Sequence, residues 1–172
     1  MKNITKLFSI ALVVLGFSTS SFAQTGVTAT ATTSVTIITP IAITKSIDMN
    51  FGNVAVNNTA GTVLLTPASL RTPSGGVSLP VVAGTVSAAK FTVTGLTGST
   101  FAIVLPIAAI TLSDGASHTM TVGSFTSTPT PTGTLTGGTQ DVLVGATLTV
   151  AGSQVAGLYT NAAGLAVTVA YN

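Results

Sequence analysis

The segment 90–105, KFTVTGLTGSTFAIVL, contains the pattern that decides the fold. Two runs within it, residues 91–94 and residues 101–105, carry apolar side chains at every second position. Side chains of a β-strand point alternately to its two faces, so each run predicts a strand with one apolar face. Residues 95–99 lie between the runs, contain two glycines, and predict a hairpin-like connection.

The same alternation recurs along the chain, and threonine fills many of the polar positions, since 33 of the 172 residues are Thr. β-Branched residues suit a half-buried pleated surface. Residues 165–171 predict the last strand. Residues 25–38 predict a long first strand, one face of which is formed by Val27, Ala29, Ala31, Thr33, Val35 and Ile37.

Shorter runs predict the strands between these two. They lie at residues 41–49, 51–56, 62–65, 77–82, 110–112, 119–125, 134–136 and 142–150. Residues 57–61 and 113–117 predict turns, and the Pro- and Gly-containing segments 67–76 and 126–133 predict loops. The sequence therefore predicts an all-β protein, an immunoglobulin-like antiparallel β-sandwich of about nine or ten short strands. We expect residues 24–172 to form one domain.

The two terminal strands of this domain are predicted to lie at unprotected edges, because they lack the charges that usually blunt an edge. Residues 24–39 then have two possible roles. The segment either docks in its own sheet or is donated to the sheet of another molecule.

The composition restricts both location and chemistry. Residues 1–23 predict a cleaved secretory signal peptide, with Lys2 and Lys6 before the apolar run 7–17 and a small-x-small site at 21–23. Without this leader, three basic and three acidic residues remain, too few for a nucleic-acid-binding patch. The chain has no Cys, which excludes disulfides and thiol chemistry. We expect a secreted protein that passes through the periplasm and is located outside the cell or on its surface. After cleavage of the signal peptide we expect no membrane span.

Two motifs deserve comparison with known chemistry. Asp114, Ser117 and His118 are the residue types of a catalytic triad, but on one short turn they favour a hairpin tip whose polar side chains face water. Residues 48–53, DMNFGN, faintly resemble a calcium loop without its closing Glu, and a strand-end turn is favoured in which Asp48 or Asn50 bonds nearby backbone. We predict no catalytic, cofactor-binding or metal-binding residue, and a protein that is not an enzyme.

A family resemblance rests on residues 41–54, IAITKSIDMNFGNV, and residues 61–67, GTVLLTP. These segments resemble an uncharacterised family of small secreted bacterial β-proteins that is known only as a domain of unknown function. Further similar features lie at 91–95, 144–148 and 157–172, so the resemblance spans nearly all of the chain after the leader. The family implies a secreted β-protein and assigns no catalytic residue.

More distantly, the layout is similar to the subunits of chaperone–usher fimbriae, in which the N-terminal extension of one subunit completes the sheet of the next. This resemblance implies that residues 25–38 are a donor strand and that residues 165–171 lie beside the acceptor groove. It implies other copies or related subunits as partners, together with a periplasmic chaperone and an usher. The chain departs from such pilins in lacking a disulfide and in the interruption of its last strand at residues 161–164.

The expected function is therefore that of a non-enzymatic, pilin-like cell-surface or fimbrial subunit in cell adhesion, which assembles by β-strand donation. The alternative from another class is a secreted carbohydrate- or surface-binding module. That alternative requires an exposed aromatic platform, for which the sequence offers Tyr159 and Tyr171.

Overall fold

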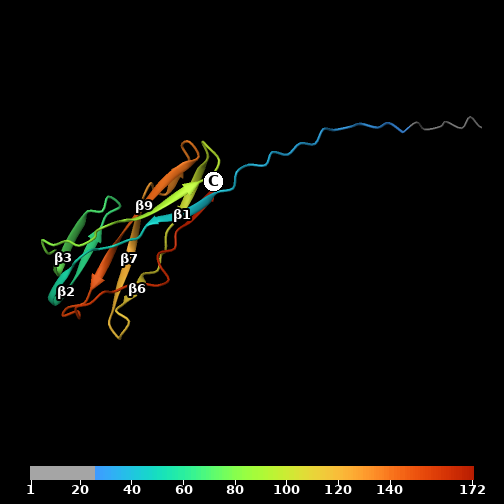
Figure 1. The fold of residues 1–172 in the computed structure, drawn as a ribbon. Coiled ribbons are helices and arrows are strands. Elements are labelled where there is room, and N and C mark those ends of the chain that lie inside the picture. Colours follow the sequence, from blue (N-terminus) through green and yellow to red (C-terminus); the bar gives the residue numbers. More distant parts are fainter. Residues whose placement is uncertain (1–25) are drawn as a thin grey trace, which may run out of the picture. The chain divides into compact units, whose positions relative to one another are not determined.

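The computed structural model describes residues 26–172, and the predicted signal peptide lies outside this part of the chain. Over these residues the chain forms ten strands and no helix (Figure 1). The strands are β1 (Ala42–Ile47), β2 (Ala55–Leu65), β3 (Arg71–Ser78), β4 (Ala89–Thr94), β5 (Thr100–Val104), β6 (Ile110–Ser113), β7 (Thr119–Thr128), β8 (Thr132–Thr134), β9 (Thr139–Val150) and β10 (Thr168–Tyr171). They form two antiparallel sheets, which confirms the all-β class. A search of the described residues finds no helix that could cross a membrane.

The larger sheet has seven strands and is organised around β9. β4 pairs with residues 139–144 and β2 with residues 146–150, so these two strands follow each other along one edge of β9. β7 pairs with the opposite edge and carries β6 on its far side, while β1 and β3 extend the sheet beyond β4 and β2. Gly145 lies where β4 gives way to β2, and a Cβ at this position would collide with the carbonyl oxygen of Leu65.

The burial of β9 shows why its sequence forms a strand with one core face. The even-numbered residues from 142 to 150 are at most 4% exposed, whereas residues 141 and 149 are exposed. This period of two is that of a pleated strand. The buried row runs the full length of the strand and consists of Val142, Val144, Ala146, Leu148 and Val150.

The smaller sheet, in the order β10-β5-β8, packs on the part of this face that holds Val142 and Val144. Its central strand contributes Phe101, which is fully buried in the same cluster as Phe91 of β4. The second layer is therefore a regular sheet over this half of the core face. We call it the covered half.

The predicted hairpin between β4 and β5 is wrong, although both strands exist where the alternation places them. β4 pairs with β1 and β9, and β5 pairs with β10 and β8, so the connection 95–99 joins the two layers. The physical reason is that the connection bonds to other segments. Gly95 N donates to Gly138 O at 3.0 Å, and Leu96 N donates to the hydroxyl of Tyr171 at 2.7 Å.

The other half of the core face, from Ala146 to Val150, is covered by segments without regular strands. Partly buried side chains pack against this second cluster from the connection between β1 and β2 and from the connection between β3 and β4, namely Met49, Val54, Leu79 and Val86. We call this part the open half. Within residues 26–172, every residue of the two core clusters comes after residue 40, so a chain that begins at Thr39 keeps both clusters.

Several predicted boundaries are corrected. The strand predicted at 51–56 begins at Ala55, and the last strand, predicted at 165–171, is limited to Thr168–Tyr171. Residues 26–40 form no strand, and all of their side chains are exposed, so the predicted first strand is not formed within the chain. The predicted turn 57–61 lies inside β2 at a register shift, and most of the predicted loop 67–76 belongs to β3. Gly75, with φ +68°, lies opposite Gly61 in this irregular ladder. The glycines led to the prediction of a turn and a loop here, whereas they allow an irregular pairing of two strands. The strand predicted at 77–82 ends at Ser78.

Candidate functional site

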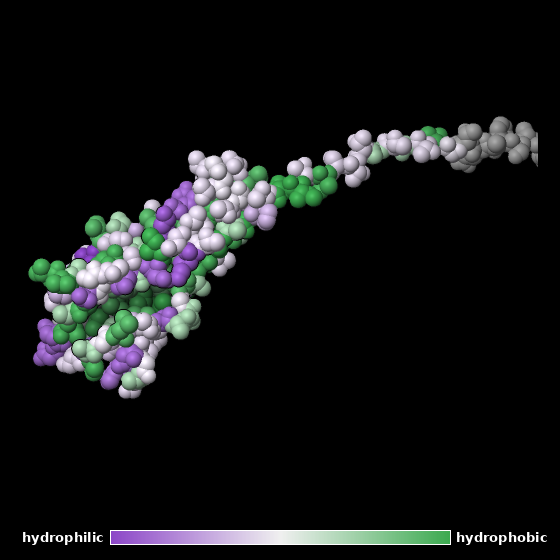
Figure 2. Space-filling model, in the orientation of Figure 1, coloured by the Kyte–Doolittle hydropathy of each residue, from purple (hydrophilic) through white to green (hydrophobic). Residues whose placement is uncertain are grey.

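A groove of about 1210 Å³ lies over the open half of the core face. Its floor is apolar and comes from β6, β7 and β9, with the residues Ile110, Leu112, Met120, Val122, Leu148 and Val150. Ile110, Val122 and Leu148 are partners in successive ladders, so they form one row across three strands. Figure 2 shows hydrophobic residues in a hollow in the part of the domain where β2 and β6 lie.

The first wall of the groove is the turn 48–54, which follows β1. The side-chain oxygen of Asn50 accepts a hydrogen bond from Gly52 N at 2.8 Å, and Gly52 has φ +67°. The main chain of Asn50 also exchanges two hydrogen bonds with Ser87, of 2.8 and 2.9 Å. The predicted strand-end turn at 48–53 is thus confirmed, with Asn50 as the residue that bonds nearby backbone.

Arg71 fastens this turn to β3. Its Nη1 atom donates to the carbonyl oxygens of Phe51 at 2.6 Å and Asn53 at 2.9 Å. The Phe51 side chain is buried in the core of the open half, so the turn is held from both sides. Sequence analysis did not identify Arg71, because the residue lies in a segment predicted as a loop and its partners are about 20 positions away.

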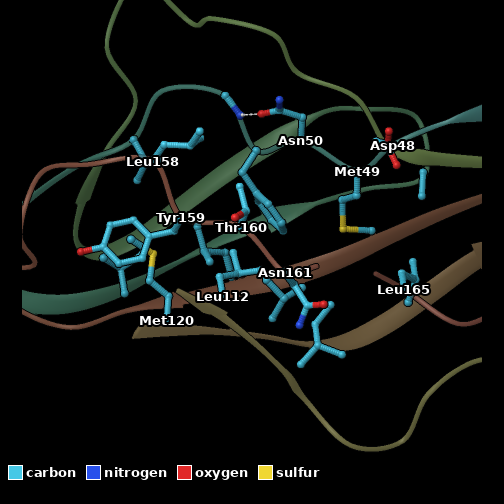
Figure 3. A pocket seen from close by; sticks show the side chains of 18 of the residues that line it. Asp48, Met49, Asn50, Leu112, Met120, Leu158, Tyr159, Thr160, Asn161 and Leu165 are labelled. Carbon is cyan, nitrogen blue, oxygen red and sulfur yellow. Dashed lines mark hydrogen bonds between the residues drawn. The ribbon is translucent and has the colours of Figure 1, made fainter. Parts of the chain in front are cut away.

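The second wall is formed by residues 154–165, which we call the strap. The strap precedes β10 and contains no strand. Figure 3 shows Asn50 of the turn above Thr160 and Asn161 of the strap, and Tyr159 of the strap near Met120 of the floor. The Leu158 side chain, which also lines the groove, is 81% exposed.

The strap and β10 continue one pattern of exposure. From residue 165 to residue 171, odd-numbered side chains are half-buried and even-numbered ones are exposed, as in a strand. Only Thr168–Tyr171 has a ladder partner, however, and that partner is β5. Continuing the register places Ala166 opposite Pro106, which has no N–H to donate. In the described part of the chain the other edge of β10 pairs with no strand.

Both tyrosines hold segments of the chain together. The Tyr171 hydroxyl accepts from Leu96 N and donates to Thr39 O at 2.8 Å, which ties the start of the core segment to the end of β10. The Tyr159 hydroxyl donates to Val155 O at 2.8 Å within the strap. Both residues are half-buried, so nothing in their arrangement favours the aromatic platform that a carbohydrate-binding module would need.

The three Asp side chains each lie beside a different basic residue, namely Lys45, Lys90 or His118. Lys45 and Asp48 pair at 2.6 Å at one end of the groove, and Lys90 and Asp141 pair at 2.7 Å on the outer face of the sheet. Hydrogen bonds from Lys90 and then Thr92 lower the pKa of Asp141 below its ordinary value. Across residues 26–172, no group of three or more His or Asp side chains comes together as a metal site would require.

Asp114 and His118 are brought together at the tip of the β6–β7 hairpin. Asp114 Oδ2 lies 2.6 Å from His118 Nδ1, and Asp114 Oδ1 accepts a hydrogen bond from Ala116 N at 2.8 Å. The contact with the His118 ring is the main cause of a lowered pKa at Asp114. The pair closes the turn between two paired strands, so the predicted hairpin tip is confirmed, but the Asp114 side chain is only 14% exposed and does not face water as predicted.

Comparison with known sequences adds one assignment to this geometry. The family described as a domain of unknown function, DUF4402, matches residues 41–171. The chain belongs to the DUF4402 family. No curated protein and no solved structure matches the chain at a significant level. The DUF4402 region contains the floor and both walls of the groove, and the match confirms the family resemblance that was based on residues 41–54 and 61–67.

Proposed function

We propose that this chain is an exported, non-enzymatic structural subunit that assembles by β-strand donation into a pilin-like surface fibre. The observation that carries the proposal is the open half of the core face, where a groove lies in place of a strand in the second layer. An extended segment placed between the turn 48–54 and the strap would complete that layer. Its backbone would lie beside the strap, as in recognition by strand addition.

Residues 26–38 have the properties of such a segment. They form no strand, and Val27, Val35 and Ile37 are 98%, 85% and 92% exposed. These three side chains share one face of an extended chain, because they occupy positions of the same parity. Full burial of a large aliphatic side chain contributes roughly 1.5–3 kcal/mol. A second copy whose groove took up this face would therefore gain substantially from association.

The charge distribution supports the same occupant. No charged residue lies between Lys6 and Lys45, so the segment is neutral throughout. Among the residues that line the groove, Lys45 and Asp48 are charged, and they pair with each other. A neutral strand can enter without burying an unpaired charge, whereas a charged one would incur a desolvation cost.

Donation from one copy to the next is a head-to-tail contact, which produces an open filament when the rotation does not close a ring. A chain of this kind is expected to reach the cell surface through the periplasm. A periplasmic chaperone that shields the groove and an outer-membrane usher are the partners we propose for assembly. Surface adhesion is the proposed role of the fibre.

The proposal is tested by comparing a chain that begins at Gln24 with one that begins at Thr39. We expect the longer chain to form multimers and the shorter one to remain a monomer that binds the peptide 25–38, measured by light scattering and calorimetry. A matched peptide with Val35→Asp and Ile37→Asp should not bind. The proposal fails if both chains are monomers and the shorter one does not bind the unmodified peptide.

A further inference from the structure

The strap makes two contacts with the outer edge of β6, which we call the latch. Ser113 and Thr160 exchange both of their main-chain hydrogen bonds, each of 2.9 Å. Two residues back along β6, the carbonyl oxygen of Thr111 accepts a hydrogen bond of 2.7 Å from the side-chain amide of Asn161. The latch thus connects the second wall of the groove to the edge of the larger sheet.

The register of the latch shows where the pairing stops. An antiparallel ladder that continued from Ser113–Thr160 would place Ala162 opposite Thr111. The chain turns instead, because Gly164 N donates to the side-chain oxygen of Asn161 at 2.7 Å. The Asn161 amide therefore supplies Thr111 with the donor that a main-chain N–H would provide in a regular ladder.

We propose that the latch positions the strap for strand donation and that the strap stays in place as the neighbour of the incoming strand. This inference rests on the proposed function. The main-chain groups of successive residues in an extended chain point to opposite edges. Thr160 is bonded to β6, so an extended strap would direct the N–H and C=O of Tyr159 away from β6 and toward the other edge of the strap. Asn161 is then a positioning residue, which acts by holding that edge in reach of a strand from a second copy.

The opposite possibility is that the strap is a temporary cover, which must leave when the strand arrives. Two observations favour a strap that remains. The strand-like alternation of exposure in β10 already begins in the strap at Leu165. The Tyr159 hydroxyl and the side chain of Gln154, which lie 2.9 Å apart, also brace the strap internally.

An engineered disulfide tests the inference cleanly, since the native chain has no Cys. A hydrogen-bonded antiparallel pair has its Cα atoms about 5.5 Å apart, within the range that a disulfide spans. We would introduce Ser113→Cys with Thr160→Cys into the chain that begins at Thr39. The matched control is Thr62→Cys with Ser74→Cys, which links paired residues of β2 and β3. Binding of the peptide 25–38 is measured for the oxidised and reduced forms.

We expect the oxidised latch variant to bind the peptide at least as tightly as its reduced form, because the strap is already held in position. Asn161→Ala should bind about three- to tenfold more weakly, because it removes the hydrogen bond to Thr111 that ties the strap to β6 as well as the bond to Gly164 N that shapes the turn. Asn172→Ala is the matched control, because its side chain bonds Thr100 and not the strap. Thermal unfolding of each variant establishes that a change in binding is not a loss of folding.

Two results would overturn the inference. Binding that weakens more than tenfold on oxidation, while the control pair is unaffected, would show that the strap has to move away. Equal affinities for Asn161→Ala and the unmodified chain would show that the latch does not position the strap. If the unmodified chain itself does not bind the peptide, the proposed function fails, and the inference fails with it.

Discussion

The two halves of the core face differ in what covers them, although one strand supplies the central row of both. In β9, Val142 and Val144 lie beneath a regular three-stranded sheet, whereas Leu148 and Val150 lie beneath a turn and a strap. The alternation that buries each row is the same. A strand therefore specifies which of its faces is buried, and the rest of the chain decides what buries it. In the open half the chain provides walls without a strand between them.

The largest expected effect separates the packing of the two halves. Phe101→Ala removes a fully buried ring from the covered half and should lower the free energy of unfolding by about 3–5 kcal/mol. Met120→Ala removes a half-buried side chain from the floor of the groove and should cost about 1 kcal/mol, because less buried area is lost. Urea denaturation of the two variants measures both values. Equal losses would contradict the distinction between a covered and an open half.

The alternation in the sequence was sufficient to predict the class of fold and the faces of its strands. The run at 91–94 lies in β4 with its apolar residues Phe91 and Val93 buried, and the run at 142–150 lies in β9. These predictions succeeded because burial of every second residue is a local consequence of the pleat. The pairing of β4 and β5 was predicted wrongly, because which edge a strand joins is set by partners far away in the sequence.

The groove was only partly predictable from sequence. The unpaired edge of the last strand and the turn around Asn50 were both anticipated from local patterns. The strap and the role of Arg71 were not anticipated. Their contacts join segments that are far apart in the sequence, and a local pattern carries no information on such contacts. The alternation from Leu165 onward, which predicted the last strand at 165–171, lies partly in the strap, because it begins before the four residues that pair with β5.

The second prediction concerns the wall of the open half. Arg71→Ala removes the guanidinium that bonds the carbonyls of Phe51 and Asn53, and it should cost about 1–3 kcal/mol of stability. Arg71→Lys should cost less, because an ammonium can keep one of the two contacts. Lys45→Ala is the control, since it removes an exposed pair with Asp48 that is expected to contribute at most about 1 kcal/mol. Hydrogen exchange at residues 50–53 should rise in Arg71→Ala and stay unchanged in the control.

If Arg71→Ala left both the stability and the exchange at residues 50–53 unchanged, the turn would be held by the burial of Phe51 and its bridge to Ser87 alone. The open half would then be closer in rigidity to the covered half than its irregular walls suggest. The difference between the two halves would then rest on the strap alone, which contains no buried aromatic side chain comparable to Phe51.

The smallest expected effect is electrostatic and lies on the outer face of the covered half. Asp141 is the cross-strand partner of Thr92, and its pKa is lowered chiefly by the ammonium of Lys90. A carboxyl whose pKa is lower in the folded state stabilises the fold above its unfolded pKa, near 3.9, and this contribution disappears as the pH falls through the folded pKa. Asp141→Asn should therefore lower Tm slightly at neutral pH, and the difference from the unmodified chain should shrink below about pH 4. If the difference in Tm stayed constant from neutral to acidic pH, Asp141 would act through packing or through hydrogen bonding that is independent of its charge. The ion pair with Lys90 would then contribute nothing that distinguishes the covered half.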